Sequence, residues 1–179
     1  MAITWRCAQC CRTQRIRSAV AAGIGWTRGV LDQAGLLDSL AALPTQLRLL
    51  LPSGAAVLGV HASHQADDGI GIEPDVTDEE LRLLLAGCDA DVVIGGHTHA
   101  ADDRFVDGIR ALNPGSPGLP RTRGIASWLV LEDDGKALTV THYSTPFDVD
   151  AVVTDLHRRH HPNAEFVSSV LTGRSLQFS

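Results

Sequence analysis

Three histidines that follow apolar runs are the residues of this sequence best suited to chemistry. His97 and His99 stand two positions apart, directly behind an apolar run at residues 92–94 that predicts a buried strand. His61 closes a similar apolar run at residues 55–60. Neutral imidazole is the commonest side-chain ligand for transition metals, and a sheet holds its ligands more rigidly than a loop does. The spacing therefore predicts a metal site formed by His61, His97 and His99.

Three short motifs carry a family resemblance. Val-His-Ala-Ser at residues 60–63, Gly-Gly-His-Thr-His at 95–99 and Asn-Pro-Gly-Ser at 113–116 occur in this order. Together they resemble the calcineurin-like metallophosphoesterases, especially their small bacterial phosphodiesterase branch. The likeness extends from about Trp26 to Arg174 and covers only the C-terminal portion of that family's domain.

The resemblance implies hydrolysis of a phosphomonoester or phosphodiester by a metal-bound hydroxide. It implies that His61 and His97 bind one divalent ion, which is manganese, iron or zinc, and that His99 binds a second ion. The Asn-Pro-Gly-Ser loop would then lie beside a small phosphate-ester substrate, with Asn113, Gly115 and Ser116 adjacent to it.

Several motifs of the resembled family are missing here. The family also has an Asp-x-His motif, a Gly-Asp pair that supplies a bridging carboxylate, and an Asn-His segment whose histidine is the catalytic acid. In this sequence no glycine precedes an aspartate and no asparagine precedes a histidine. The Asp-x-His string at residues 155–157 lies in a helical pattern near the C-terminus, where we expect a solvated surface. No catalytic residue is therefore identified.

The missing carboxylates limit what the site can do. Two metal ions about 3.5–4 Å apart need a bridging anion and several ligands each, whereas the sequence offers three neutral imidazoles. We expect a weakly or incompletely bound metal, an impaired phosphoesterase and a truncated domain. The alternative is a non-catalytic metallophosphoesterase-like remnant that serves as a binding or scaffold module. A histidine-triad nucleotide hydrolase is disfavoured, because Ala101 occupies the position of the third alternating histidine.

The elements that would hold the histidines follow from local patterns. Residues 47–51 and 55–60 read as two strands joined by a tight turn. Thr77 and Glu80 form a capping box, and the apolar stripe over residues 81–88 predicts a helix. A strand, a helix and a second strand make a βαβ unit with parallel strands, whose carboxyl ends meet at one sheet edge. Open α/β sheets bind their ligands at that edge.

Two hairpins and two helical regions complete the predicted fold. Asp-Gly turns at residues 107–108 and 134–135 indicate hairpins, and we expect both hairpins in a second sheet. Helical patterns precede Pro44, with a break at Gly35, and run from Val149 to Leu171, with a break at Pro162. The predicted fold class is α/β: a partial calcineurin-like four-layer αββα sandwich of mixed sheets that lacks its N-terminal strands.

Composition restricts the function classes. The chain has 179 residues, 44% of them hydrophobic, and a formal charge of −6, which argues against nucleic acid as the main partner. No apolar run reaches the roughly 18 residues needed to cross a bilayer, so we expect a cytoplasmic protein without a membrane partner. Unpaired strand edges predict self-association.

The sequence divides into two regions of different composition. Residues 1–18 form an atypical leader rich in arginine, with Cys7, Cys10 and Cys11, and we expect it to be disordered. Residues 19–179 are expected to form one domain.

Overall fold

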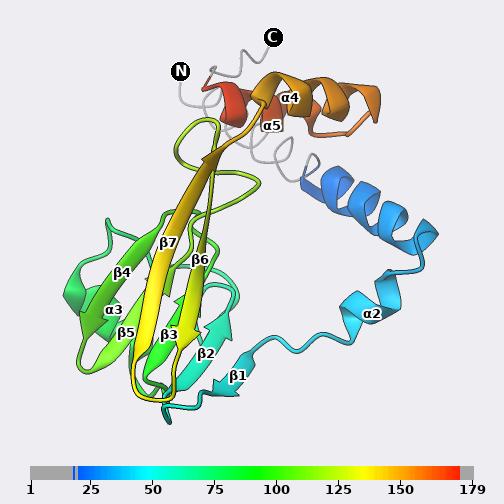
Figure 1. Ribbon diagram of the computed structural model, residues 1–179. Helices are drawn as coiled ribbons and strands as arrows, with labels where there is room; N and C mark the ends of the chain where they lie inside the picture. The colour runs from blue at the N-terminus through cyan, green and yellow to red at the C-terminus, as the bar shows by residue number, and fades with distance from the viewer. Residues whose placement is uncertain (1–17, 19, 174–179) are drawn as a thin grey trace, which may run out of the picture. The chain divides into compact units, whose positions relative to one another are not determined.

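The described part of the chain divides into two compact units. A computed structural model describes residues 18 and 20–173 (Figure 1). One unit comprises Pro44–Phe147, and the other combines the residues up to Leu43 with those from Asp148 onward. The expected leader with its three cysteines lies outside the described residues, apart from Ser18, so its boundary stays a prediction.

A five-stranded mixed sheet forms the centre of the Pro44–Phe147 unit. The three inner strands run parallel to one another, and the two outer strands are antiparallel to their neighbours. In spatial order the strands are β1 (Leu47–Leu50), β2 (Ala56–Val60), β3 (Val92–Gly95), β5 (Ile109–Asn113) and β4 (Asp102–Val106). The predicted parallel pairing of β2 with β3 is confirmed.

Helix α3 (Asp78–Leu85) covers one face of this sheet. The Thr77 side chain accepts a hydrogen bond from the Glu80 backbone N–H, while the Glu80 side chain accepts from the Thr77 N–H, as the capping box predicts. The buried side chain of Leu81 packs in one cluster with Leu58 of β2 and Val93 of β3. The helix therefore lies within the crossover connection between the two strands that carry the histidines, and it packs on both strands.

A two-stranded sheet covers the opposite face. Strands β6 (Ile125–Asp133) and β7 (Leu138–Pro146) are antiparallel neighbours. Their inward side chains pack against the buried Val57, Val92 and Leu112 of the larger sheet. The unit is thus a mixed α/β sandwich, and three of the four expected layers lie within it.

One part of the predicted topology is wrong. The hairpin around the Asp107–Gly108 turn forms as expected, but it belongs to the first sheet, because β5 pairs parallel with β3. The reason is visible in burial: the neighbours Ala111 and Leu112 of β5 are both fully buried, one in each of the two hydrophobic clusters. A strand that is buried on both faces belongs in the middle of a sandwiched sheet.

The second unit is helical. Residues 20–33 form a helix, and α2 (Leu37–Ala41) follows after the predicted break at Gly35, whose φ is +69°. Helices α4 (Val149–Arg158) and α5 (Ala164–Thr172) are separated near Pro162, as predicted. Among the described helices, none is both long enough and apolar enough to cross a bilayer.

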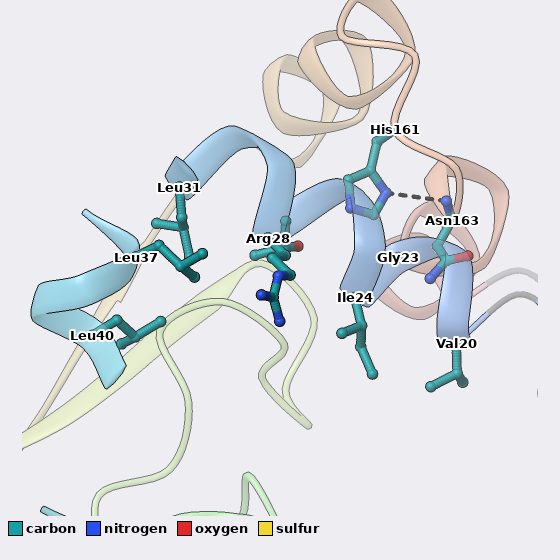
Figure 2. A pocket seen from close by; sticks show the side chains of 10 residues that line it. Val20, Gly23, Ile24, Arg28, Leu31, Leu37, Leu40, His161 and Asn163 are labelled. Carbon is teal, nitrogen blue, oxygen red and sulfur yellow. Dashed lines mark hydrogen bonds between the residues drawn. The ribbon is translucent and has the colours of Figure 1, made fainter. Parts of the chain in front are cut away.

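A groove of about 530 Å³ lies within this helical unit (Figure 2). Apolar side chains of helix 20–33 and α2 line most of it, and His161 and Asn163 complete the wall. His161 is half-buried and packs edge-on against Trp26, with ring centroids 4.7 Å apart. All three C-terminal histidines were expected at the surface. His157 and His160 are exposed, but His161 is not.

Candidate metal centre

The histidines of the central unit lie at the carboxyl ends of two adjacent parallel strands. His61 follows β2 and His97 follows β3, whose last residues pair as Val60 with Gly95. The two strand ends remain connected beyond the sheet, because the Gly96 backbone N–H donates to the His61 carbonyl at 2.8 Å. This connection fixes the two histidine backbones relative to each other.

The rings of His61 and His97 face each other. Nδ1 of His97 lies 3.2 Å from Nε2 of His61, and the two ring planes are inclined by 78°. Imidazole nitrogens bound to one zinc ion at about 2.0–2.1 Å in tetrahedral geometry are roughly 3.3–3.4 Å apart. The pair therefore fits two ligands of a single divalent ion, with Nε2 of His61 and Nδ1 of His97 as the donor atoms.

His99 is arranged differently. Its Nδ1 lies 2.9 Å from the carbonyl oxygen of Leu119, so this nitrogen carries the proton and donates the hydrogen bond. Metal-binding histidines commonly donate their second ring N–H to a carbonyl or carboxylate in this way, which fixes the tautomer and leaves the other nitrogen free. Nε2 is thus the atom of His99 that is able to bind a metal.

In the part of the chain that the structure describes, no carboxylate joins His61 and His97 in a group of three ligands. Within residues 20–173, no three histidine, cysteine, aspartate or glutamate side chains gather closely enough to hold a metal ion. The structure brings His61 and His97 together and does not bring His99 into a cluster of three. The Asp155 side chain belongs to the helical unit, where hydrogen bonds from Arg158 and then Arg159 hold its pKa below the usual range. Those bonds occupy Asp155 at the surface, as expected from the sequence.

The predicted substrate-adjacent residues of the Asn-Pro-Gly-Ser loop are buried. Asn113 is fully buried and Ser116 is 5% exposed. The Gly115 N–H donates to Oδ1 of Asn113 at 2.8 Å, and the Ser116 N–H donates to Oγ of Ser127 at 3.0 Å. The backbone N–H groups of Gly115 and Ser116 are thus already engaged within the protein. A role for Asn113, Gly115 and Ser116 in binding substrate stays a prediction.

Sequence reasoning missed Ile72 and Thr98. Thr98 stands between the two histidines, and its hydroxyl donates to the Ile72 carbonyl at 2.9 Å. Gly71 is required there, because a β-carbon at that position would come within 2.8 Å of the Thr98 methyl group. Residues 70–76 form an irregular loop, so no local periodicity indicates this contact. The sequence signal for it is Gly71, because a glycine beside an apolar residue can mark a close approach of two segments.

Comparisons with known proteins identify a family and a fold. The calcineurin-like phosphoesterase superfamily domain matches residues 28–136, which is more than half of the chain. The probable metallophosphoesterase YsnB of Bacillus subtilis is 41% identical over 95 residues, which is 53% of this chain and 53% of that protein. The chain thus spans about half the length of this relative.

Solved structures share the fold. A hypothetical protein from Pyrococcus horikoshii superimposes with a TM-score of 0.66 at 19% identity, over 76% of this chain and 53% of the other. A metallophosphoesterase from Sphaerobacter thermophilus gives a TM-score of 0.59 at 20% identity, over 79% of this chain and 64% of the other. With the sequence match to the domain, these findings show that the chain belongs to the calcineurin-like phosphoesterase superfamily.

Proposed function

We propose that this chain is a metal-dependent phosphoesterase that acts on a small phosphomonoester or phosphodiester, with impaired activity. The observation that carries the proposal is the 3.2 Å approach of the His61 and His97 ring nitrogens at the ends of two parallel strands. Membership of the superfamily supports the reaction class. The candidate ions are manganese, iron and zinc; imidazole suits iron and zinc, whereas manganese prefers oxygen ligands.

The contacts of the histidine rings support the role that we propose for each histidine. His61 and His97 would hold one ion through Nε2 and Nδ1, the two atoms that face each other. His99 would offer Nε2 to a second ion, because Leu119 fixes its other nitrogen. When bound, the metal supplies Lewis acidity, which polarises a phosphoryl oxygen and lowers the pKa of water.

The weakness of the site is also part of the proposal. Two neutral imidazoles do not offset the charge of a divalent ion, and the described residues add no carboxylate to the pair. Metal affinity is therefore expected to be modest, and occupancy of a second site lower still. The alternative, a binding module without turnover, is the outcome if the folded, metal-loaded chain has no activity.

The test combines metal binding with turnover. The purified chain is stripped of metal, reloaded with manganese or zinc, and assayed with p-nitrophenyl phosphate and bis-p-nitrophenyl phosphate, while isothermal titration calorimetry measures metal affinity. We expect His97→Ala to lose the tightest metal site and any hydrolysis. His157→Ala removes an exposed histidine of α4 and serves as the control, which should retain both.

Two results decide against the phosphoesterase. Equal metal affinity in the wild-type protein and His97→Ala would show that the histidine pair is not the metal site. Metal binding at the pair without hydrolysis of either ester would favour the binding module.

A further inference from the structure

The side chain of Asn113 lies at the centre of a buried hydrogen-bond network behind the histidines. Its Nδ2 is 2.8 Å from the Gly96 carbonyl, 2.8 Å from Oγ1 of Thr98 and 2.7 Å from the Ile72 carbonyl. Its Oδ1 accepts from the Gly115 N–H at 2.8 Å. One fully buried amide thus joins the end of β5, the segment behind the histidines and the loop at residue 72.

The donors and acceptors of this network balance. The Thr98 hydroxyl gives its proton to the Ile72 carbonyl, so its oxygen is free to accept from Asn113. The two amide protons of Asn113 serve three acceptors, on Gly96, Thr98 and Ile72, so two of these acceptors share one proton. A fully satisfied buried network is rigid, whereas loss of one member leaves buried groups without partners.

The segment that this network holds has an unusual backbone. His97 and His99 have φ angles of +56° and +60°, in the left-handed region that residues other than glycine rarely adopt. Such a conformation persists only where the surroundings fix it. Asn113 bonds the Gly96 carbonyl, just before His97, and the Gly96 N–H bonds the His61 carbonyl. The network therefore reaches both histidines of the facing pair through one residue, Gly96.

We infer that Asn113 and Thr98 are positioning residues that hold the His61 and His97 ring nitrogens at a separation suited to one metal ion. They act from behind the site and touch neither substrate nor metal. The inference rests on the proposed function, because it assigns these residues a purpose at the same metal site. It gives Asn113 a role other than the substrate contact expected from the sequence.

A matched pair of substitutions at Thr98 tests the inference. Thr98→Val keeps the methyl group that packs against Gly71 and removes the hydroxyl, whereas Thr98→Ser keeps the hydroxyl and removes the methyl group. Both variants are milder than Asn113→Ala, which leaves a void and several unpaired groups and endangers folding. The zinc affinity is measured by isothermal titration calorimetry on the full chain, and Thr77→Ala, which weakens the cap of α3, controls for general loss of stability.

We expect Thr98→Val to weaken zinc binding about 10- to 100-fold, as is typical for residues that orient metal ligands. Thr98→Ser and Thr77→Ala should bind zinc within about threefold of the wild-type protein. Equal affinity in Thr98→Val and the wild-type protein would overturn the inference. So would a larger loss in Thr98→Ser than in Thr98→Val, because the packing of the methyl group would then be the cause.

A second readout needs no metal and separates this inference from the proposed function. Hydrogen exchange of the Gly96 amide, which donates to His61, is measured in the metal-free protein with the Leu81 amide of α3 as reference. We expect Thr98→Val to speed exchange at Gly96 at least tenfold and to leave Leu81 unchanged. If the wild-type protein binds no zinc, the proposed function fails, but the exchange rate at Gly96 still tests whether Thr98 holds the histidine segment in place. An unchanged exchange rate at Gly96 in Thr98→Val would overturn the positioning role.

Discussion

Arg104 fastens the loop before α3 to the edge strand β4, and its removal is expected to be unusually costly. Its guanidinium donates to the Val76 carbonyl at 2.7 Å, to the Glu73 carbonyl at 2.8 Å and to the Asp102 carboxylate at 2.9 Å. The Arg104 side chain is 23% exposed and that of Asp102 only 8%. A fourth, longer bond of 3.3 Å reaches the exposed Asp78 carboxylate. Arg104→Met therefore removes four charge-assisted hydrogen bonds and leaves the nearly buried Asp102 carboxylate without its cation.

The magnitude follows from these contacts. A hydrogen bond to a charged group contributes about 1.5–3 kcal/mol, and removing one partner of a buried ion pair costs roughly 3–5 kcal/mol. Because these terms overlap and Arg104 is partly exposed, we expect the free energy of unfolding to fall by about 3 kcal/mol. With a urea dependence of about 2 kcal/mol per molar, the midpoint should drop by roughly 1.5 M. Arg104→Lys should recover only part of this loss, because one ammonium lacks the planar fork of the guanidinium.

Arg82 provides the matched control for this prediction. Its only ion pair in the described residues joins it to Asp107 at 2.9 Å, and the two side chains are 51% and 61% exposed. Exposed pairs contribute about 0–1 kcal/mol, so Arg82→Met should move the urea midpoint by less than about 0.5 M. Urea unfolding followed by circular dichroism measures both variants. Equal midpoints for Arg82→Met and Arg104→Met would refute the reasoning from burial.

Two further predictions concern the two edges of the five-stranded sheet. Hydrogen bonds from Arg110 hold the pKa of Asp103 on β4 below its usual value. The pair therefore stabilises the protein fully at pH values above the unfolded pKa of about 3.9, and this stabilisation is lost as the pH falls through the folded pKa. Asp103→Asn should therefore lower the free energy of unfolding by about 1 kcal/mol at pH 7 and by nothing below the folded pKa, as measured by urea unfolding across pH; a constant difference would contradict this. On the other edge, Leu50 of β1 is 78% exposed, and Leu50→Lys should reduce self-association measured by light scattering at high concentration, because a charge on an open edge opposes strand pairing. A wild-type protein that stays monomeric under those conditions would contradict the predicted self-association.

Local patterns in the sequence were sufficient for most individual elements. The capping box at Thr77 and the stripe that follows it specify α3, and the Asp107–Gly108 turn specifies a hairpin, because each feature depends on residues a few positions apart. The order of strand, helix and strand then fixes the parallel pairing of β2 and β3 through the handedness and length of the crossover. These signals were enough to predict that His61 and His97 meet at one sheet edge.

The membership of a strand in one sheet or the other depends on distant residues, and there the sequence was insufficient. Strand β5 was expected beside the second hairpin, yet it pairs with β3 and is buried by apolar side chains on both faces. The adjacent Ala111 and Leu112 are a signal of burial on two faces, since a strand with one wet face alternates apolar and polar residues. The adjacent apolar residues Ala111 and Leu112 therefore favour a place for β5 in the central sheet.

The same placement of β5 explains why the buried network escaped sequence reasoning. Asn113 reads as a turn residue, because the prolyl and glycyl residues that follow it dictate a turn. Its amide reaches Gly96 and Ile72 only because β5 lies directly beside β3, which sets the end of one strand against the segment that leaves the other. A hydrogen bond across 41 residues leaves no local periodicity. A histidine pair can therefore be found from its own spacing, whereas the residues that hold it in place become visible only once the strand order is known.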